Sequence, residues 1–257
     1  MGLLTLNKWS ADMKELNKTT VYDWPTRIFH WLFAFLFVVA YVIAETVSDE
    51  SSLFTLHIMA GLTIGFILVL RIIWGFVGTT YARFSTFELH PIELIRYFKD
   101  AVVSKTKNYF GHNPASSYAA IIMFICAAGL AITGVMMTGG SESDFYEETH
   151  QLLANIFLIT VIAHVGGIMF HHIKHRDSLW SSMFDGKKNA LSGKTGITNS
   201  KRFAGILFLI LTLGWTGYLY SKYDSTNNTL DFFGQELVLG EEEHESESAY
   251  EEEHDDD

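Results

Sequence analysis

The sequence predicts an all-α membrane protein, in which a transmembrane four-helix bundle is followed by a fifth, C-terminal transmembrane helix. Hydrophobic residues make up 49 % of the chain, and they concentrate in five blocks of bilayer-spanning length. If the blocks cross a membrane in alternating directions, almost all Lys and Arg residues lie on the same side of it. A helix of about 20 apolar residues crosses the roughly 30 Å hydrocarbon core and satisfies its own backbone hydrogen bonds there.

Five predicted spans divide the chain. They run from Arg27 to Ala44, Leu53 to Val77, Ser116 to Thr138, Glu148 to Ile173 and Arg202 to Ser221. The segment before them is polar and mixed in charge, unlike a signal peptide, so the first span is expected to direct insertion. We therefore expect an N-terminal segment (1–23), a four-helix domain (24–187), a linker with the fifth helix (188–222) and an acidic tail (223–257).

The distribution of Lys and Arg predicts the orientation of the spans. Of the 18 basic residues, only Lys222 lies at the ends of the spans that face away from the N-terminus. Cytoplasmic loops carry an excess of Lys and Arg. The N-terminus is therefore expected in the cytoplasm and the C-terminus outside.

The net charge of −11 belongs wholly to one segment. Residues 241–257, "EEEHESESAYEEEHDDD", are rich in Asp and Glu and contain no Lys or Arg. A block of like charge is normally disordered and solvated. The alternative is a docking surface for a basic partner.

Cysteine usage limits how a redox cofactor can be held. Cys126 is the only cysteine and lies in the third span. Disulfides, iron–sulfur clusters and covalent c-type haem attachment are therefore unavailable within this chain. Any redox cofactor must be bound by other side chains.

Two histidines bracket the fourth span, "HQLLANIFLITVIAH", from His150 to His164. Fourteen helical residues return to within about 40° of the same face after a rise of about 21 Å. Ionisable residues at membrane depth are costly and usually mark a cofactor, ion or substrate path. Each of these rings therefore needs a partner at its own depth.

Depth matching predicts two histidine pairs. His30 lies at the cytoplasmic start of the first span, level with His164, and His57 lies at the outer start of the second, level with His150. Neutral imidazoles bind haem iron from both axial sides, so each pair is expected to hold one haem between helices. His171 lies one heptad beyond His164 on nearly the same face and is the alternative inner ligand.

Other residues near the pairs have two interpretations each. Glycines near the ligands leave room for a flat macrocycle or allow tight helix packing; they are Gly61, Gly65, Gly166 and Gly167. Arg27 and Arg71 are expected to meet a propionate of the inner haem, or else to reach the headgroups with their charged ends. His90 and His112 are expected on the surface.

The long connection from Phe84 to Phe110 has apolar residues at helical spacing among basic ones. They are Leu94, Ile95, Phe98 and Val102. This pattern predicts an interfacial helix that lies along the membrane. A hinged lid and a wall of a quinone site are the alternatives.

Four motifs resemble a known family. They are "VYDWPTRIFHW" (Val21 to Trp31), "HIMAGLTIG" (His57 to Gly65), "GHNPASS" (Gly111 to Ser117) and "HQLLANIFLITVIAHVGG" (His150 to Gly167). They are similar to the prokaryotic cytochrome b561 family and to the cytochrome b subunits of nickel–iron hydrogenases and formate dehydrogenases. The resemblance spans roughly Val21 to Lys187, so the fifth span and the tail depart from it.

The resemblance implies a protein with two haem b groups that exchanges electrons with membrane quinone. Its ligand positions fall on His30, His57, His150 and His164. We expect a multi-pass protein of the bacterial inner membrane, in contact with lipid, that passes electrons between the quinone pool and a periplasmic redox protein. A c-type cytochrome or a hydrogenase-like subunit is the expected partner, and nucleic acid is not.

Two other functions remain open from the sequence. A stand-alone membrane oxidoreductase would act on a small molecule such as superoxide without a protein partner. A non-redox protein would use the histidines for metal or proton transport.

The charge bias predicts the result of reporter fusions. A reporter that is active only outside the cytoplasm should be active when fused after Lys222 and silent when fused near Lys187, because the two sites flank the fifth span. The opposite result would show that the topology is inverted. The haem expected near the cytoplasm would then lie on the outer side, and the other haem on the cytoplasmic side.

Overall fold

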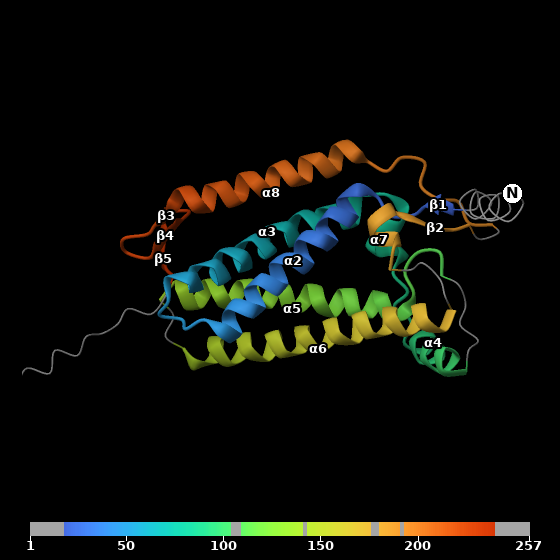
Figure 1. The fold of residues 1–257 in the computed structure, drawn as a ribbon, viewed down its shortest axis with the longest axis horizontal. Coiled ribbons are helices and arrows are strands. Elements are labelled where there is room, and N and C mark those ends of the chain that lie inside the picture. Colours follow the sequence, from blue (N-terminus) through green and yellow to red (C-terminus); the bar gives the residue numbers. More distant parts are fainter. Residues whose placement is uncertain (1–17, 104–108, 141–142, 176–179, 191–192, 240–257) are drawn as a thin grey trace, which may run out of the picture.

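The structure, a computed structural model, describes residues 18–103, 109–140, 143–175, 180–190 and 193–239, so the acidic segment 241–257 lies outside the described residues. Five long helices dominate it (Figure 1). They are α2 (Trp24–Thr46), α3 (Thr55–Val77), α5 (Pro114–Thr138), α6 (Asp144–His175) and α8 (Arg202–Lys222). Each is long and apolar enough to cross a membrane. The predicted all-α membrane architecture is confirmed.

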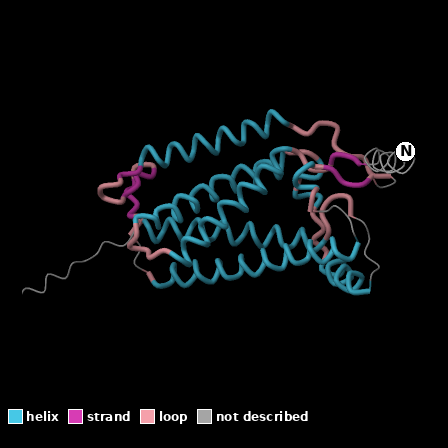
Figure 2. The backbone as a smooth tube through the Cα atoms, viewed as in Figure 1, coloured by secondary structure: helices cyan, strands magenta, loops and turns pink. Residues whose placement is uncertain are grey.

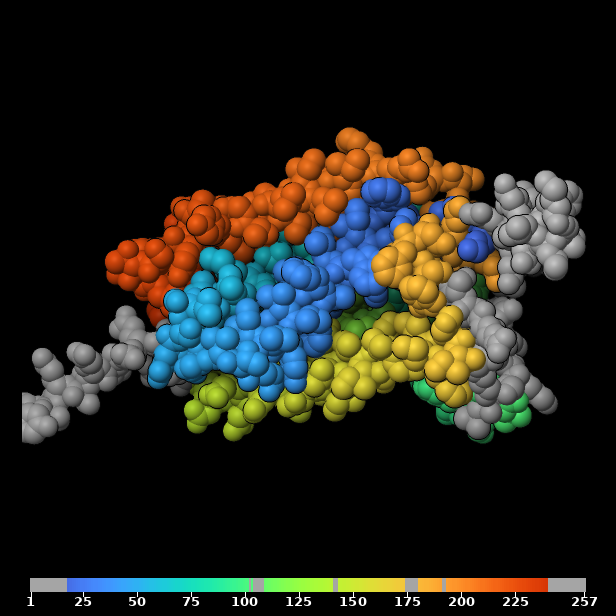
Figure 3. Space-filling model, in the orientation of Figure 1, coloured from blue at the N-terminus to red at the C-terminus, as the bar shows by residue number. Residues whose placement is uncertain are grey.

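The first four of these helices form a bundle of two helical hairpins. Helix α2 packs along α3, α5 packs along α6, and α3 joins the hairpins through α5. Helix α8 packs on α2 and α3, on the opposite side of the bundle from α6 (Figures 1 and 2). The space-filling view shows α8 as an outer layer along this side (Figure 3). The fifth helix therefore extends the bundle without entering it.

Two of the helices begin where the sequence supplies a cap followed by proline. Asp23 is the N-cap of α2 and accepts a hydrogen bond from Thr26 N at 3.0 Å, with Pro25 in the first turn. Asn113 and Ser116 form a reciprocal capping box at the start of α5. A cap satisfies a free N–H of the first turn, and proline has no N–H to leave unsatisfied.

The end of the bundle near the N-terminus is closed by a short strap. Strand β1 (Lys18–Thr20) pairs antiparallel with β2 (Lys187–Asn189), directly after the one-turn helix α7 (Ser182–Asp185). Gly186 between them has a φ of 76°, and its carbonyl accepts hydrogen bonds from Val21 N and Tyr22 N. A Cβ at this position would lie 2.7 Å from Tyr22 O, so glycine is needed.

The predicted interfacial helix is present but short. Helix α4 covers Pro91–Val103 and packs against α5. Two 3-10 turns, Thr80–Ala82 and Phe84–Thr86, occupy the chain before it. Ile92, Ile95 and Phe98 are exposed. An exposed apolar face suits a helix on a membrane surface, and that location stays a prediction.

The other end of the bundle carries a small sheet that the sequence analysis did not predict. Strands β3 (Tyr223–Asp224), β4 (Thr229–Phe232) and β5 (Gln235–Val238) are antiparallel neighbours. Their leucines pack with α8 and α3 in one cluster: Leu62, Leu219, Leu230, Leu237 and Leu239. Strands of two to four residues are too short for alternation to reveal them. The first part of the expected acidic tail is therefore a folded cap.

A buried carboxylate joins the start of α2 to the end of α3. Asp23 is 0 % exposed. Besides its cap bond, its Oδ2 accepts hydrogen bonds from Trp74 Nε1 at 3.0 Å and Thr79 Oγ1 at 2.7 Å. The sequence analysis assigned no role to this residue, because its partners lie far along the chain.

Replacing Asp23 with Ala should lower stability strongly. Three donors would lose their acceptor, and each buried unsatisfied group costs about 1–3 kcal/mol. Thermal unfolding of the detergent-solubilised protein, followed by circular dichroism, should show a clearly lower midpoint. Asp144→Ala, at an exposed acid in the first turn of α6, is the control. Equal midpoints for the two variants would contradict the role of the network.

Candidate functional site

The four predicted ligand histidines lie on three helices at two levels of the bundle. His30 belongs to α2, His57 to the first turn of α3, and His150 and His164 to α6. Helix α6 packs along α5. In the described residues, its backbone comes close to α2 and α3 at few points. Side chains must therefore span the space that separates α6 from α2 and α3.

The outer pair, His57 and His150, meets directly. Their ring centroids are 6.2 Å apart and their planes differ by 60°. Metal–nitrogen bonds are about 2 Å long and each ring adds about 1 Å, so two imidazoles that share one metal ion have centroids roughly 6 Å apart. The observed spacing fits two axial ligands of one iron.

Hydrogen bonds orient both rings of the outer pair. His57 Nδ1 lies 2.8 Å from Ala40 O, a backbone acceptor, so Nδ1 donates. His150 Nδ1 lies 2.8 Å from Thr133 Oγ1, whose own proton points to Gly129 O. His150 therefore also donates from Nδ1. Metal-binding histidines usually donate their second ring N–H in this way, and Nε2 of each ring keeps its lone pair for a metal.

The inner pair, His30 and His164, is less close. The two side chains interact electrostatically, but no direct ring contact between them is seen in the described residues. His30 lies edge-on to Trp31, with 5.3 Å between centroids. His171, the alternative inner ligand, lies further along α6 and is half-buried. The choice between His164 and His171 stays a prediction.

An aromatic contact separates the two levels. Phe157 lies on α6 midway between His150 and His164 and is 2 % exposed. Its ring packs against Phe33 at 5.7 Å and Phe37 at 4.6 Å, both on α2. Seven residues make nearly two helical turns, so Phe157 faces the same side as both histidines. The sequence analysis assigned no role to Phe157, although its spacing of seven residues from both histidines indicates that it shares their helix face.

The glycines near the histidines fall into two groups. A Cβ at Gly65 would lie 3.2 Å from Ala131 Cβ, so Gly65 allows close packing of α3 on α5. At Gly61, Gly166 and Gly167 a Cβ would meet no described atom within 4 Å. Tight packing therefore explains Gly65 alone, and the other three leave open space.

Arg71 is a buried cation within α3, 3 % exposed. Its Nη2 donates to Ala82 O at 3.0 Å, and its guanidinium lies 5.2 to 5.9 Å from three aromatic rings. Its Nη1 is buried without a hydrogen-bond partner in the described part of the chain. An unpaired charged donor at this depth suits a cofactor carboxylate, as predicted for a propionate.

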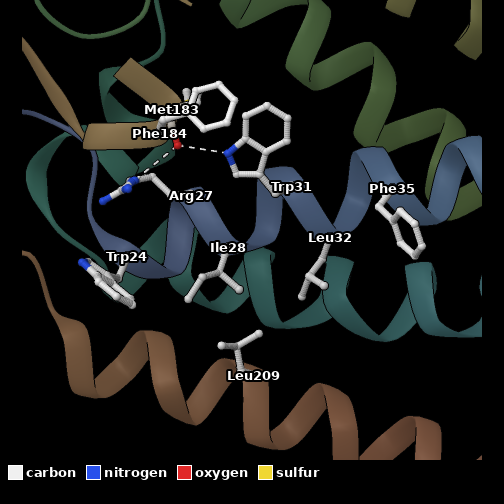
Figure 4. A pocket seen from close by; sticks show the side chains of 9 residues that line it. All are labelled: Trp24, Arg27, Ile28, Trp31, Leu32, Phe35, Met183, Phe184 and Leu209. Carbon is white, nitrogen blue, oxygen red and sulfur yellow. Dashed lines mark hydrogen bonds between the residues drawn. The ribbon is translucent and has the colours of Figure 1, made fainter. Parts of the chain in front are cut away.

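Arg27 lies in a different setting. Its Nε donates to Met183 O at 3.3 Å, and Trp31 Nε1 donates to the same carbonyl at 3.1 Å (Figure 4). The guanidinium lines a pocket between α2, α7 and α8. Its contact with a propionate stays a prediction.

His112 is not the surface residue that the sequence analysis expected. Its ring packs between Phe87 at 4.6 Å and Tyr22 at 6.1 Å, and its buried Nδ1 has no partner among the described residues. Burial, with Lys188 and Arg71 nearby, lowers the pKa of His112 to about 3. The imidazole is therefore neutral at physiological pH. The expectation was wrong because the strap of residues 18–22 and 186–188 covers this loop, whereas His90 is exposed as expected.

The histidines do not belong to a larger cluster of metal-binding side chains in the part of the chain that the structure describes. In the described residues, no three His, Cys, Asp or Glu side chains gather as a metal site would require. The donor set that the structure brings together is one pair of imidazoles, His57 and His150, with the separate buried guanidinium of Arg71. Such a pair suits an ion whose remaining ligands come from a macrocycle.

The comparisons with known proteins agree with this chemistry. Residues 21–186 match the family described as prokaryotic cytochrome b561. A probable Ni/Fe-hydrogenase B-type cytochrome subunit of Rhizobium leguminosarum bv. viciae is 28 % identical over 217 residues, covering 68 % of this chain and 90 % of the relative. The probable Ni/Fe-hydrogenase 1 B-type cytochrome subunit of Escherichia coli K12 is 27 % identical over 230 residues, covering 71 % and 94 %. No solved structure matches the chain.

The fold, the His57–His150 pair and the family match define a multi-pass membrane cytochrome of the b type, an electron-transport protein that binds haem. The chain belongs to the prokaryotic cytochrome b561 family. The family match ends at residue 186, so α8 and the sheet lie beyond it.

The hydrogen bond between Thr133 and His150 generates a prediction. Thr133→Val removes the acceptor of the Nδ1 proton, and loss of such a partner typically weakens metal binding 10–100-fold. The purified variant should retain less haem in a pyridine haemochrome assay. Thr160→Val is the control, because Thr160 lies on α6 like His150 and is bonded only to Ile156 O in the described structure. Equal haem contents would show that Thr133 does not support the ligand.

Proposed function

We propose that the chain is a di-haem cytochrome b subunit that transfers electrons between the membrane quinone pool and an external, hydrogenase-like redox partner. The observation that carries this proposal is the His57–His150 pair, with 6.2 Å between centroids and both Nδ1 atoms engaged. A six-coordinate iron held by two histidines exchanges electrons without offering a vacant site for a substrate. This favours electron transfer over direct chemistry on a small molecule.

Each part of the site has one task in this proposal. His57 and His150 hold the outer haem, and His30 and His164 hold the inner one. Arg71 neutralises a propionate of the inner haem through its unpaired Nη1. Haem b supplies a one-electron couple at iron when it is bound. Phe157, with Phe33 and Phe37, keeps the two levels apart and excludes water between them.

The partner follows from the relatives and from the orientation. Both relatives above are described as probable hydrogenase cytochrome subunits, and the charge bias puts the His57–His150 end outside. A hydrogenase-like protein would therefore dock at the periplasmic end, beside the C-terminal sheet, with a c-type cytochrome as the alternative partner. The acidic residues 241–257 would follow the sheet on the same side and steer a basic surface toward it.

Histidine variants test the ligand pairs. The purified protein should contain two haem b groups per chain in a pyridine haemochrome assay. His57→Ala and His150→Ala should each remove the same spectral component, while His30→Ala and His164→Ala should remove the other, because one axial ligand alone does not hold the group. His90→Ala, at an exposed histidine, is the control and should keep both.

Three outcomes would contradict parts of this proposal. A colourless protein would exclude haem altogether. If His164→Ala kept both haems and His171→Ala lost one, the inner ligand would be His171. If His57→Ala and His150→Ala removed different components, the outer pair would be wrong.

A further inference from the structure

A pocket of about 440 Å³ lies between α2, α7 and α8 at the N-terminal end of the bundle (Figure 4). Its wall on α2 runs from Trp24 to Phe35, Leu209 of α8 forms the opposite wall, and Phe184 of α7 lies over one end. Volumes of this size hold small ligands. The residue pattern of the pocket shows which chemistry it accepts.

One end of the pocket carries an excess of positive charge. The Arg27 and Arg202 guanidiniums lie 5.9 and 5.8 Å from the same indole ring, that of Trp24. The acid that interacts with Arg27 is Asp185, and it also lies 3.9 Å from Lys18. Arg27 and Lys18 therefore share one carboxylate, and Arg202 has no ion pair among the described residues. A bound anion would balance the charge.

The other end of the pocket is apolar and reaches toward the middle of the bilayer. Ile28, Leu32, Phe35 and Leu209 line it. From Trp24 to Phe35 the helix rises roughly 16 Å, which is close to the hydrocarbon depth of one leaflet, about 15 Å. Tryptophans at the charged end, Trp24 and Trp31, are typical of the membrane–water interface. The pocket thus passes from headgroup to acyl-chain depth.

Part of the pocket comes from the segment beyond the family match. Leu209, which lines the pocket, belongs to α8, and so does Arg202, which lies beside Trp24 at the charged end. The match to the family ends at residue 186. Gly205 brings the two helices together here, since a Cβ on it would lie 2.7 Å from Trp24 Cβ. The added helix therefore creates a wall and a second cation that the four-helix domain lacks.

We propose that this pocket binds an anionic phospholipid. The phosphate is held by Arg27 and Arg202, and one acyl chain lies along α2 against Leu209. A quinone would place a neutral ring at the charged end, which leaves the positive charge there unbalanced, and a soluble anion would leave the apolar end empty. The excess of positive charge selects anionic over zwitterionic headgroups.

Native mass spectrometry of the detergent-purified holoprotein tests the headgroup contact. The probes are phosphatidylglycerol and phosphatidylcholine with identical acyl chains. Saturable binding of one phosphatidylglycerol, stronger than that of phosphatidylcholine, is expected. Arg27→Gln and Arg202→Gln should each weaken phosphatidylglycerol binding about tenfold or more, because each removes a charged hydrogen bond. Arg96→Gln, at an exposed arginine of α4 that pairs with Glu93, is the matched control and should bind as the original chain does.

A second pair of variants tests the acyl-chain contact. Leu209→Trp should fill the apolar end and weaken both lipids, whereas Leu213→Trp, one turn further on an exposed face of α8, should weaken neither. The bound lipid is read from the mass, so this result stands apart from the haem content that tests the proposed function.

Three results would overturn the proposal. The first is equal affinity of the original chain for the two lipids. The second is displacement of phosphatidylglycerol by a short-chain quinone, which would make the pocket a quinone site. The third is loss of haem absorbance in Arg27→Gln with phosphatidylglycerol binding retained, which would assign Arg27 to haem.

Discussion

The exclusion of water from the bilayer core forces every polar group of the spans to find a partner in the protein or a cofactor, and this constraint organises the structure. His57 and His150 each donate from Nδ1 to an oxygen of a neighbouring helix, Ala40 O on α2 and Thr133 Oγ1 on α5. Those bonds fix both rings, so the two Nε2 atoms are left for one shared ligand. Helix α6 meets α3 at this level through the ring of His150, while α6 packs along α5 over its length.

At the opposite end of the bundle, the buried polar groups that need partners are charged side chains. Asp23 accepts hydrogen bonds from three donors and interacts electrostatically with Arg71. Arg71 remains only partly satisfied, with Nη1 buried and unbonded in the described structure. No close ion pair joins Asp23 to Arg71 in the described residues, which leaves this cation available to a cofactor. Under the proposed function, Asp23 serves structural stability and Arg71 serves cofactor binding.

The chain beyond the family match extends both ends of the bundle. Helix α8 covers α2 and α3, and the sheet of residues 223–238 packs its leucines over the ends of α8 and α3. Thr55 at the start of α3 donates to Asn228 Oδ1 at 2.9 Å, so the sheet is bonded two residues before His57. Under the proposed function, an external partner would meet this sheet next to the His57–His150 pair. At the other end, α8 forms the wall of the pocket beside Arg27.

The sequence by itself determined the five spans and the shared level of His57 and His150, because hydrophobic length and helical rise depend only on the local chain. The pairing of His57 with His150 followed from depth, and the structure brings these two rings together. Only the tertiary structure decided that Phe157 packs on α2, that His112 is covered by a strap, and that Arg27 faces a pocket while Arg71 is buried. Each of these depends on which helix faces which, and that is set by packing between segments far apart in the chain, which spacing along one helix does not encode.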